Sequence, residues 1–314
     1  MTSPPVATRR PRWRVIAEIV FGAVAVVLMV TVVVINWESF REGIATLSWS
    51  AVLASVIAIA LATLANVESW RRTLAMLGSR ITVLQAGEIM LVSQIGKYIP
   101  GGVWPIVAGS SRGTRAGVAP ARTALSLAMQ LAISLTVGGI ISLGALLFIP
   151  ALSNSWWIVI PIAAVGLVML APPVLRRLLR LAARILRRPG PIEIDGRQLL
   201  AATCWSFVAW LFFGLSLWSL VAEQSFGAPR VLLLCFVGYA VSWVIGFLMV
   251  LVPAGAGVRE AVLVLLLGGT LGAAQTTAVA LVSRIEMVAV DAALFLIALS
   301  LSYRSARLKR EMEG

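Results

Sequence analysis

Long apolar runs, each close to the length that crosses a bilayer, constrain this chain more than any other feature. A hydrocarbon core about 30 Å thick needs about 20 predominantly apolar residues per spanning helix. Runs of this kind occupy 15–35, 48–66, 124–149, 156–175, 199–222 and 276–300. The sequence therefore predicts an all-α polytopic membrane protein with six full spans.

Composition agrees with this fold class and excludes several others. Hydrophobic residues make up 60% of the 314 residues and charged residues only 12%, which is too little polar surface for a soluble domain of this size. The net charge is +13, but the basic residues lie in short segments between apolar runs, so we expect no nucleic-acid partner. The chain has no histidine, and Cys204 and Cys235 have no paired spacing, so we expect no metal, disulfide or cofactor.

The distribution of arginine and lysine predicts the orientation of the spans, because cytoplasmic loops are enriched in these residues. The segments expected in the cytoplasm are the N-terminal tail, 67–82, 110–123, the basic loop 176–198 and the C-terminal tail. The segments expected outside are 36–47 and 150–155. The first span is expected to stay uncleaved as an anchor in the inner membrane, with both termini in the cytoplasm.

Two apolar stretches remain, 83–109 and 231–272, and each contains a Pro/Gly break. The first contains Pro100 and Gly101, and the second runs Pro253-Ala254-Gly255-Ala256-Gly257. The assigned orientation requires the first stretch to begin and end inside and the second to begin and end outside. Each is therefore expected to be a hairpin that dips into the membrane or crosses it twice. Broken backbone at membrane depth persists only where it is buried in protein or lines a cavity.

The two halves of the chain, 15–149 and 156–300, then share one plan of two spans, a broken hairpin and one span. Their topologies are opposite, as in transporters built from inverted repeats, where the broken segments form the substrate site near the midplane. We therefore expect one transmembrane domain over 1–314 that contains an inverted-topology repeat. A coincidental pair of Pro/Gly kinks is the alternative.

Ionisable residues inside the apolar runs must be paired or face water, because each costs about 2.5–3.5 kcal/mol near a helix centre. Several residues in the two broken stretches and the last span meet this description: Glu88, Lys97, Arg259, Glu260, Arg284, Glu286 and Asp291. Helical spacing places Arg284 and Asp291 on one face, and it directs Glu286 nearly opposite to Arg284, where it needs another partner or lies nearer a membrane interface.

The basic members of this set are candidates to bind an anionic head group. Arginine forks match phosphate, and lysine acts as a point charge, which favours Lys97, Arg259 and Arg284. The carboxylates would balance them or carry protons, and Tyr98 is a candidate to line the path. The alternative is that all the charges form structural ion pairs that hold the bundle together.

Three segments resemble the transmembrane region of lysylphosphatidylglycerol synthase/flippase proteins, a family described as flippase-like: 66–71 (NVESWR), 93–104 (SQIGKYIPGGVW) and 253–260 (PAGAGVRE). The resemblance implies a lipid-translocating membrane domain that acts on aminoacylated phospholipid or another lipid-linked head group. The positions that it singles out are Lys97, Pro100, Gly101, Pro253, Gly255, Gly257, Arg259, Glu260 and Arg284. Longer members carry a soluble aminoacyl-transferase domain. This chain stops soon after its last span, so we expect a stand-alone member that does not synthesise lysyl-lipid.

The leading functional hypothesis is a flippase that moves an anionic or lipid-linked head group, from a phospholipid or a polyprenyl-phosphate glycolipid, across the inner membrane. A membrane-embedded glycosyl- or phosphotransferase is the first alternative, and the absence of histidine and of an Asp-x-Asp pair disfavours it. The second alternative is an accessory subunit for a glycosyltransferase or another lipid-modifying enzyme, which leaves the buried charges unexplained. We expect a non-enzyme whose partner is a lipid.

Overall fold

The computed structural model describes residues 34, 37–98, 104–148, 177, 195–221, 228–249 and 255–313, with side chains described as far as residue 302. Every regular element in these ranges is helical. The α-helices are α2 (Trp37–Ala45), α3 (Trp49–Met76), α4 (Val83–Gln94), α5 (Trp104–Gly113), α6 (Pro120–Ser142), α10 (Gly196–Ser219), α12 (Pro229–Leu248), α13 (Val258–Leu271) and α14 (Ala273–Glu313). Three short 3-10 helices join them: η1 (Ile95–Tyr98), η2 (Thr114–Ala116) and η3 (Leu143–Leu147).

Among the described helices, α3, α6, α10, α12 and α14 are long and apolar enough to cross a membrane. Four of them contain most of the runs predicted at 48–66, 124–149, 199–222 and 276–300, which confirms a multi-pass helical membrane protein. The predicted spans 15–35 and 156–175, and nearly all of the basic loop 176–198, lie outside the described residues.

The two predicted hairpins differ in the lengths of their arms. In the first, α4 has 12 residues and α5 has 10. At 1.5 Å per residue these arms are about 18 and 15 Å long, too short to cross a 30 Å core. In the second, α12 has 20 residues and is long enough to span, while α13 has 14. Neither arm of the first hairpin is therefore long enough to span, whereas the second hairpin combines a full-length arm with a short one.

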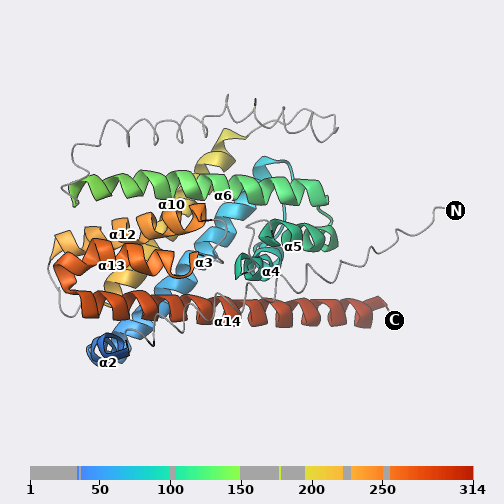
Figure 1. Ribbon diagram of the computed structural model, residues 1–314. Coiled ribbons are helices and arrows are strands. Elements are labelled where there is room, and N and C mark those ends of the chain that lie inside the picture. Colours follow the sequence, from blue (N-terminus) through green and yellow to red (C-terminus); the bar gives the residue numbers. More distant parts are fainter. Residues whose placement is uncertain are drawn as a thin grey trace, which may run out of the picture.

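The arms of each hairpin pack against one another, and both hairpins pack against α14. Figure 1 shows α12 and α13 toward one end of the bundle and α4 and α5 toward the other, near the C-terminal end of α14. The hairpins thus approach from opposite ends, as the inverted arrangement requires. Because the arms differ in length and two predicted spans lie outside the described residues, the repeat itself stays a prediction.

Helix α3 crosses the bundle obliquely between α6 and α14 (Figure 1) and continues ten residues beyond the predicted span. Its extension carries the NVESWR segment. Within that segment the carboxylate of Glu68 accepts hydrogen bonds from Arg71 and Arg72 at 2.6–2.7 Å, one turn away along the helix. Such i,i+3 and i,i+4 pairs stabilise a helix and neutralise the carboxylate, so the charged residues do not end it.

The same segment ties α3 to two neighbouring helices. The Trp70 indole donates to Ser126 Oγ of α6 at 2.9 Å, and the Ser69 hydroxyl donates to the Ala202 carbonyl of α10 at 2.8 Å. Both side chains are fully buried. The sequence alone favoured a cytoplasmic anchor here, and the structure adds that the segment holds helices together.

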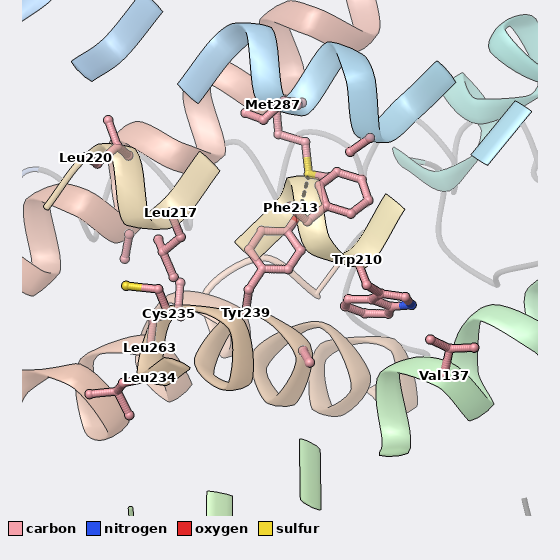
Figure 2. Packing of buried hydrophobic residues seen from close by; sticks show 14 of the residues in the cluster. Val137, Trp210, Phe213, Leu217, Leu220, Leu234, Cys235, Tyr239, Leu263 and Met287 are labelled. Carbon is pink, nitrogen blue, oxygen red and sulfur yellow. Dashed lines mark hydrogen bonds between the residues drawn. The ribbon is translucent and has the colours of Figure 1, made fainter. Parts of the chain in front are cut away.

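A second buried cluster joins α10, α12 and α14 (Figure 2). The Trp210 ring makes edge contacts with Phe213 and Tyr239 at centroid distances of 6.4 and 6.2 Å, and Phe213 stacks on Tyr239 at 5.1 Å. The Tyr239 hydroxyl lies 3.9 Å from the Met287 sulfur of α14. Aromatic pairs of this geometry add about 0.5–1.5 kcal/mol each beyond burial, so they hold α10 against α12, and the Met287 contact adds α14 to the cluster.

Candidate functional site

The candidate site is built on one face of α14, where Arg284 and Asp291 lie seven residues apart. Two turns separate them, about 10.5 Å along the axis, so both project toward the hairpins. Both side chains are buried. The predicted common face is confirmed, because each of these residues forms an ion pair with a different hairpin.

The first hairpin is held to α14 through its 3-10 helix η1. Lys97 Nζ lies 2.7 Å from Asp291 Oδ2, and the Tyr98 hydroxyl donates to the same oxygen at 2.5 Å. The Asp291 side chain is 4% exposed and that of Lys97 is 27% exposed, so only the lysine reaches an accessible surface. One carboxylate oxygen thus receives both polar side chains of the GKY sequence.

Gly96 allows η1 to lie directly against the other arm of the hairpin. A Cβ atom on Gly96 would lie 2.6 Å from the backbone nitrogen of Pro105 and 2.7 Å from the Trp104 carbonyl carbon. Backbone atoms cannot rotate away as a flexible side chain can. The position of Lys97 therefore depends on a glycine at 96.

Replacing Gly96 by alanine should push η1 away from α5 and weaken the Lys97 contact with Asp291. We expect a loss of about 1–3 kcal/mol in the free energy of unfolding, the usual cost of overpacking. Detergent-solubilised protein can be compared by its thermal unfolding midpoint. Gly87→Ala in α4 is the matched control, since its added Cβ meets only ordinary contact at 3.9 Å. Equal midpoints for Gly96→Ala and wild type would contradict the close approach.

The second hairpin is held to α14 by Glu260. Arg284 Nε lies 3.8 Å from Glu260 Oε1, and both side chains are buried. Glu260 lies in the first turn of α13. This helix begins directly after Gly257, whose φ of 81° is left-handed. A carboxylate in the first turn is stabilised by the helix dipole. The predicted placement of Arg259 and Glu260 at the start of the return helix is confirmed.

Arg259 occupies a different environment from the paired cations. Its guanidinium carbon lies 5.4 Å from the centre of the Trp243 ring of α12, within the range of a cation–π interaction. A Cβ on Gly246 would lie 2.6 Å from Arg259 Cγ, so this glycine makes room for the arginine. The buried Nε of Arg259 has no hydrogen-bond partner, and its side chain forms no salt bridge with any residue in the described part of the chain.

A second close glycine contact lies where the second hairpin turns from α12 to α13. Gly255, with a φ of 69°, lies against the backbone of Gly246, where an added Cβ would be 2.9 Å from the Gly246 Cα. A side chain at 255 would thus be strained and obstructed. Pro100, Gly101 and Pro253, predicted from the two breaks, lie outside the described residues.

Electrostatics connect the two hairpin contacts into one site. Tyr98 of the first hairpin interacts with the charges of Arg284 and Arg259 as well as that of Asp291, and buried Tyr239 of α12 interacts with the same three charges. We call this group the convergent cluster: Lys97, Tyr98, Arg259, Glu260, Arg284 and Asp291. It contains three cations and two carboxylates, which leaves one positive charge in excess.

Two predicted residues lie apart from the convergent cluster. Glu286 faces α3, where the Ser55 hydroxyl donates to its Oε2 at 2.5 Å, so the expectation of a separate partner is confirmed. Glu88 lies half-buried on α4 and forms no salt bridge with a described residue. Neither is placed beside the basic groups.

Several residues in or near the site could not be identified from the sequence. Trp243, Tyr239 and Ser55 sit in uniformly apolar runs, where neither type nor spacing distinguishes them from packing residues. Gly246 gave a weak signal, because a lone glycine inside a helix usually has a packing reason. Among the residues that the structure describes, no group of three or more Cys, Asp or Glu side chains could hold a metal ion.

The fold and the site together define a polytopic helical membrane protein with a charged cluster buried where two broken hairpins meet. The model of the lysylphosphatidylglycerol synthase TM region family matches residues 15–294, and the chain belongs to that family. No curated protein matches the chain at a significant level. The resemblance in the three short segments is thereby confirmed, and membership indicates a flippase-like role connected with membrane lipids.

Proposed function

We propose that this protein is a lipid flippase that moves an anionic or lipid-linked head group across the inner membrane, past the convergent cluster. The observation that carries the proposal is the meeting of both hairpins on α14 with an excess of positive charge. Arg259 forms no salt bridge with a residue in the described ranges, and its Nε is buried.

The energetics of the cluster favour an anionic ligand. A cation in the membrane core costs about 2.5–3.5 kcal/mol on insertion scales, and Arg259 offsets that cost through the Trp243 ring and the charge of Glu260, without a salt bridge to a described residue. A phosphate group would supply the missing charge and accept paired hydrogen bonds from the guanidinium. A lipid anion would therefore be bound more tightly than a zwitterion.

The ion pairs on either side give such an anion a path. Arg284 and Glu260 are separated by 3.8 Å, longer than a charge-assisted hydrogen bond, so the pair is loosely closed. Lys97 is partly accessible beside Asp291. Each cation can exchange its carboxylate for phosphate without being left uncompensated, which is what passage between the two hairpins would require.

The class of the protein and its location in the cell follow from the same proposal. We infer that the protein is not an enzyme, that its partner is a membrane lipid or lipid-linked sugar, and that it lies in the cell membrane with both termini in the cytoplasm. Family membership and the basic segments between apolar runs support these inferences.

The test uses proteoliposomes that contain fluorescent phosphatidylglycerol, with a membrane-impermeant quencher to measure exchange between leaflets. Arg259→Ala should slow translocation about tenfold or more, because losing a hydrogen-bonded charge contact of about 1.5–3 kcal/mol lowers head-group binding. Arg230→Ala, at an exposed position in the first turn of α12, is the matched control and should match wild type.

Two further measurements make the result decisive. Fluorescent phosphatidylcholine should move more slowly than phosphatidylglycerol in wild type, and Arg259→Ala should reduce that difference. The thermal unfolding midpoint of Arg259→Ala shows whether the fold is intact. Unchanged phosphatidylglycerol translocation by a folded Arg259→Ala variant would contradict the proposed role of the cluster.

A further inference from the structure

Glu286 is a buried carboxyl group in the core of the bundle that the convergent cluster does not use. It is 5% exposed, on the face of α14 that packs against α3. The Ser55 hydroxyl binds Oε2, while Oε1 is buried with no hydrogen-bond partner among the described residues. A serine and a carboxyl group thus meet across 231 positions of the chain, inside an otherwise apolar interface.

No cation in the described part of the chain compensates this carboxyl group. Its one hydrogen bond is with Ser55, and it forms no salt bridge with a described residue. On α3, the nearest ionisable residue in the C-terminal direction is Glu68, thirteen residues and about 20 Å from Ser55. The predicted spans 15–35 and 156–175 contain no lysine and no arginine, so neither span supplies a cation to Glu286.

The other elements that surround α14 direct their charges elsewhere. Lys97 of η1 pairs with Asp291, and Glu260 of α13 pairs with Arg284. Arg259 of α13 lies over Trp243 of α12. None of the following charged residues on the helices that contact α14 is buried: Glu38, Arg41 and Glu42 of α2, Arg71 and Arg72 of α3, Glu88 of α4, and Arg197 of α10.

An ionised carboxylate in this environment is costly. The effective penalty for an unpaired buried ion is several kcal/mol, whereas a neutral carboxylic acid keeps the Ser55 hydrogen bond and avoids the charge. Glu260 and Asp291 differ, because each lies in an ion pair with a cation. The proton would sit on Oε1, the oxygen that Ser55 leaves unbound.

We propose that Glu286 is a proton-binding site that takes up and releases one proton as the lipid head group moves, so that translocation is coupled to a proton gradient. This inference rests on the proposed flippase function. Each ion pair has one member on α14. These members, Arg284 and Asp291, lie two residues before and five residues after Glu286. A movement of α14 that opens either pair also moves Glu286 relative to Ser55.

Proton coupling also removes an electrical cost. Moving one elementary charge against the membrane potential requires about 2.3 kcal/mol per 100 mV. A head group with one negative charge that crosses together with one proton carries no net charge. The Glu286 carboxylate supplies the place where that proton is held while the anion occupies the cluster.

The test combines lipid translocation with a pH-sensitive dye enclosed in the same proteoliposomes. Wild type should acidify or alkalinise the lumen as fluorescent phosphatidylglycerol moves, and its rate should vary with pH, by at most about tenfold per pH unit for one proton. Glu286→Gln mimics the protonated form. It should still move lipid down its gradient, but without the dye signal and without the dependence on pH.

A spectroscopic measurement tests proton binding independently of transport. Infrared difference spectra of wild type should contain the carbonyl stretch of a buried carboxylic acid, which Glu286→Gln should remove. Ser55→Ala should shift this band, because it deletes the hydrogen bond to Oε2. If Glu286→Gln folds poorly, the shift of this band in Ser55→Ala still tests the assignment, because that variant keeps the Glu286 carboxyl group.

The outcomes separate the two proposals. Wild-type translocation with a dye signal that survives in Glu286→Gln would overturn proton coupling through Glu286 and leave the flippase function standing. The same holds if wild type moves lipid with no dye signal at all. An absence of translocation by wild type for every anionic probe would overturn the flippase function and, with it, the coupling.

Discussion

Replacing Arg284 by alanine is expected to lower the free energy of unfolding by about 3–5 kcal/mol, one of the two largest effects that we predict. The substitution leaves Glu260 buried without its cation. Removing one member of a buried ion pair is far more costly than removing both, because the remaining charge is uncompensated. It also releases the second hairpin from α14.

The measurement is equilibrium unfolding in mixed detergent micelles, with a double-mutant cycle. Glu260→Gln added to Arg284→Ala should recover a large part of the lost stability, since no buried charge then remains at the pair. Arg41→Ala at an exposed position on α2 should change stability by less than about 0.5 kcal/mol. If Arg284→Ala were as mild as Arg41→Ala, the ion pair would have no role in holding the hairpin.

The same variants distinguish a structural cluster from a transporting one. If the double variant is stable and still moves anionic lipid at the wild-type rate, Arg284 serves only to hold the bundle together. If it is stable and inactive, Arg284 contacts the head group as well. Stability and translocation therefore have to be measured on the same preparations.

Replacing Trp70 by alanine is expected to have a similarly large effect, about 3–5 kcal/mol of the free energy of unfolding. The indole is 0% exposed, at the contact of α3 with α6. Its loss leaves a cavity and an unpaired Ser126 hydroxyl. Because α3 packs against α4, α6, α10 and α14, a cavity here loosens the frame that holds the site.

Trp70→Phe separates the two contributions. It keeps most of the ring but deletes the indole donor, so it should cost only the hydrogen bond, about 1 kcal/mol, plus the smaller volume. Trp49→Ala is the matched control, because that tryptophan begins the same helix and is 88% exposed. Equal unfolding free energies for Trp70→Ala and Trp49→Ala would contradict the packing described here.

Several features of the fold and the site could be predicted from sequence because they depend on neighbours along the chain. Hydropathy over a window is a local property, and it located most of α3, α6, α10 and α14. The seven-residue spacing placed Arg284 and Asp291 on one face of α14. The glycine break placed Arg259 and Glu260 in the first turn of α13. The loop charges predicted that the first broken stretch is a hairpin.

Pairing between distant residues could not be predicted in the same way. Nothing in the sequence matches Ser55 with Glu286, Lys97 with Asp291, or Trp243 with Arg259. In an apolar environment, helices associate through close packing of small residues and a few polar contacts, so many arrangements satisfy the same hydropathy pattern. The NVESWR segment illustrates this, since its charges predicted a surface anchor and Trp70 and Ser69 were found buried between helices.

By itself the sequence determined that the chain crosses a membrane several times, that two segments are broken, and that the ionisable residues inside apolar runs had to be paired or face water. These results follow from the cost of placing charge and unpaired backbone in hydrocarbon. Only the tertiary structure decided which of these charges meet. It gathered three cations and two carboxylates on α14, and it left Glu286 apart with Ser55, because helix packing alone sets the distance between residues far apart in the chain.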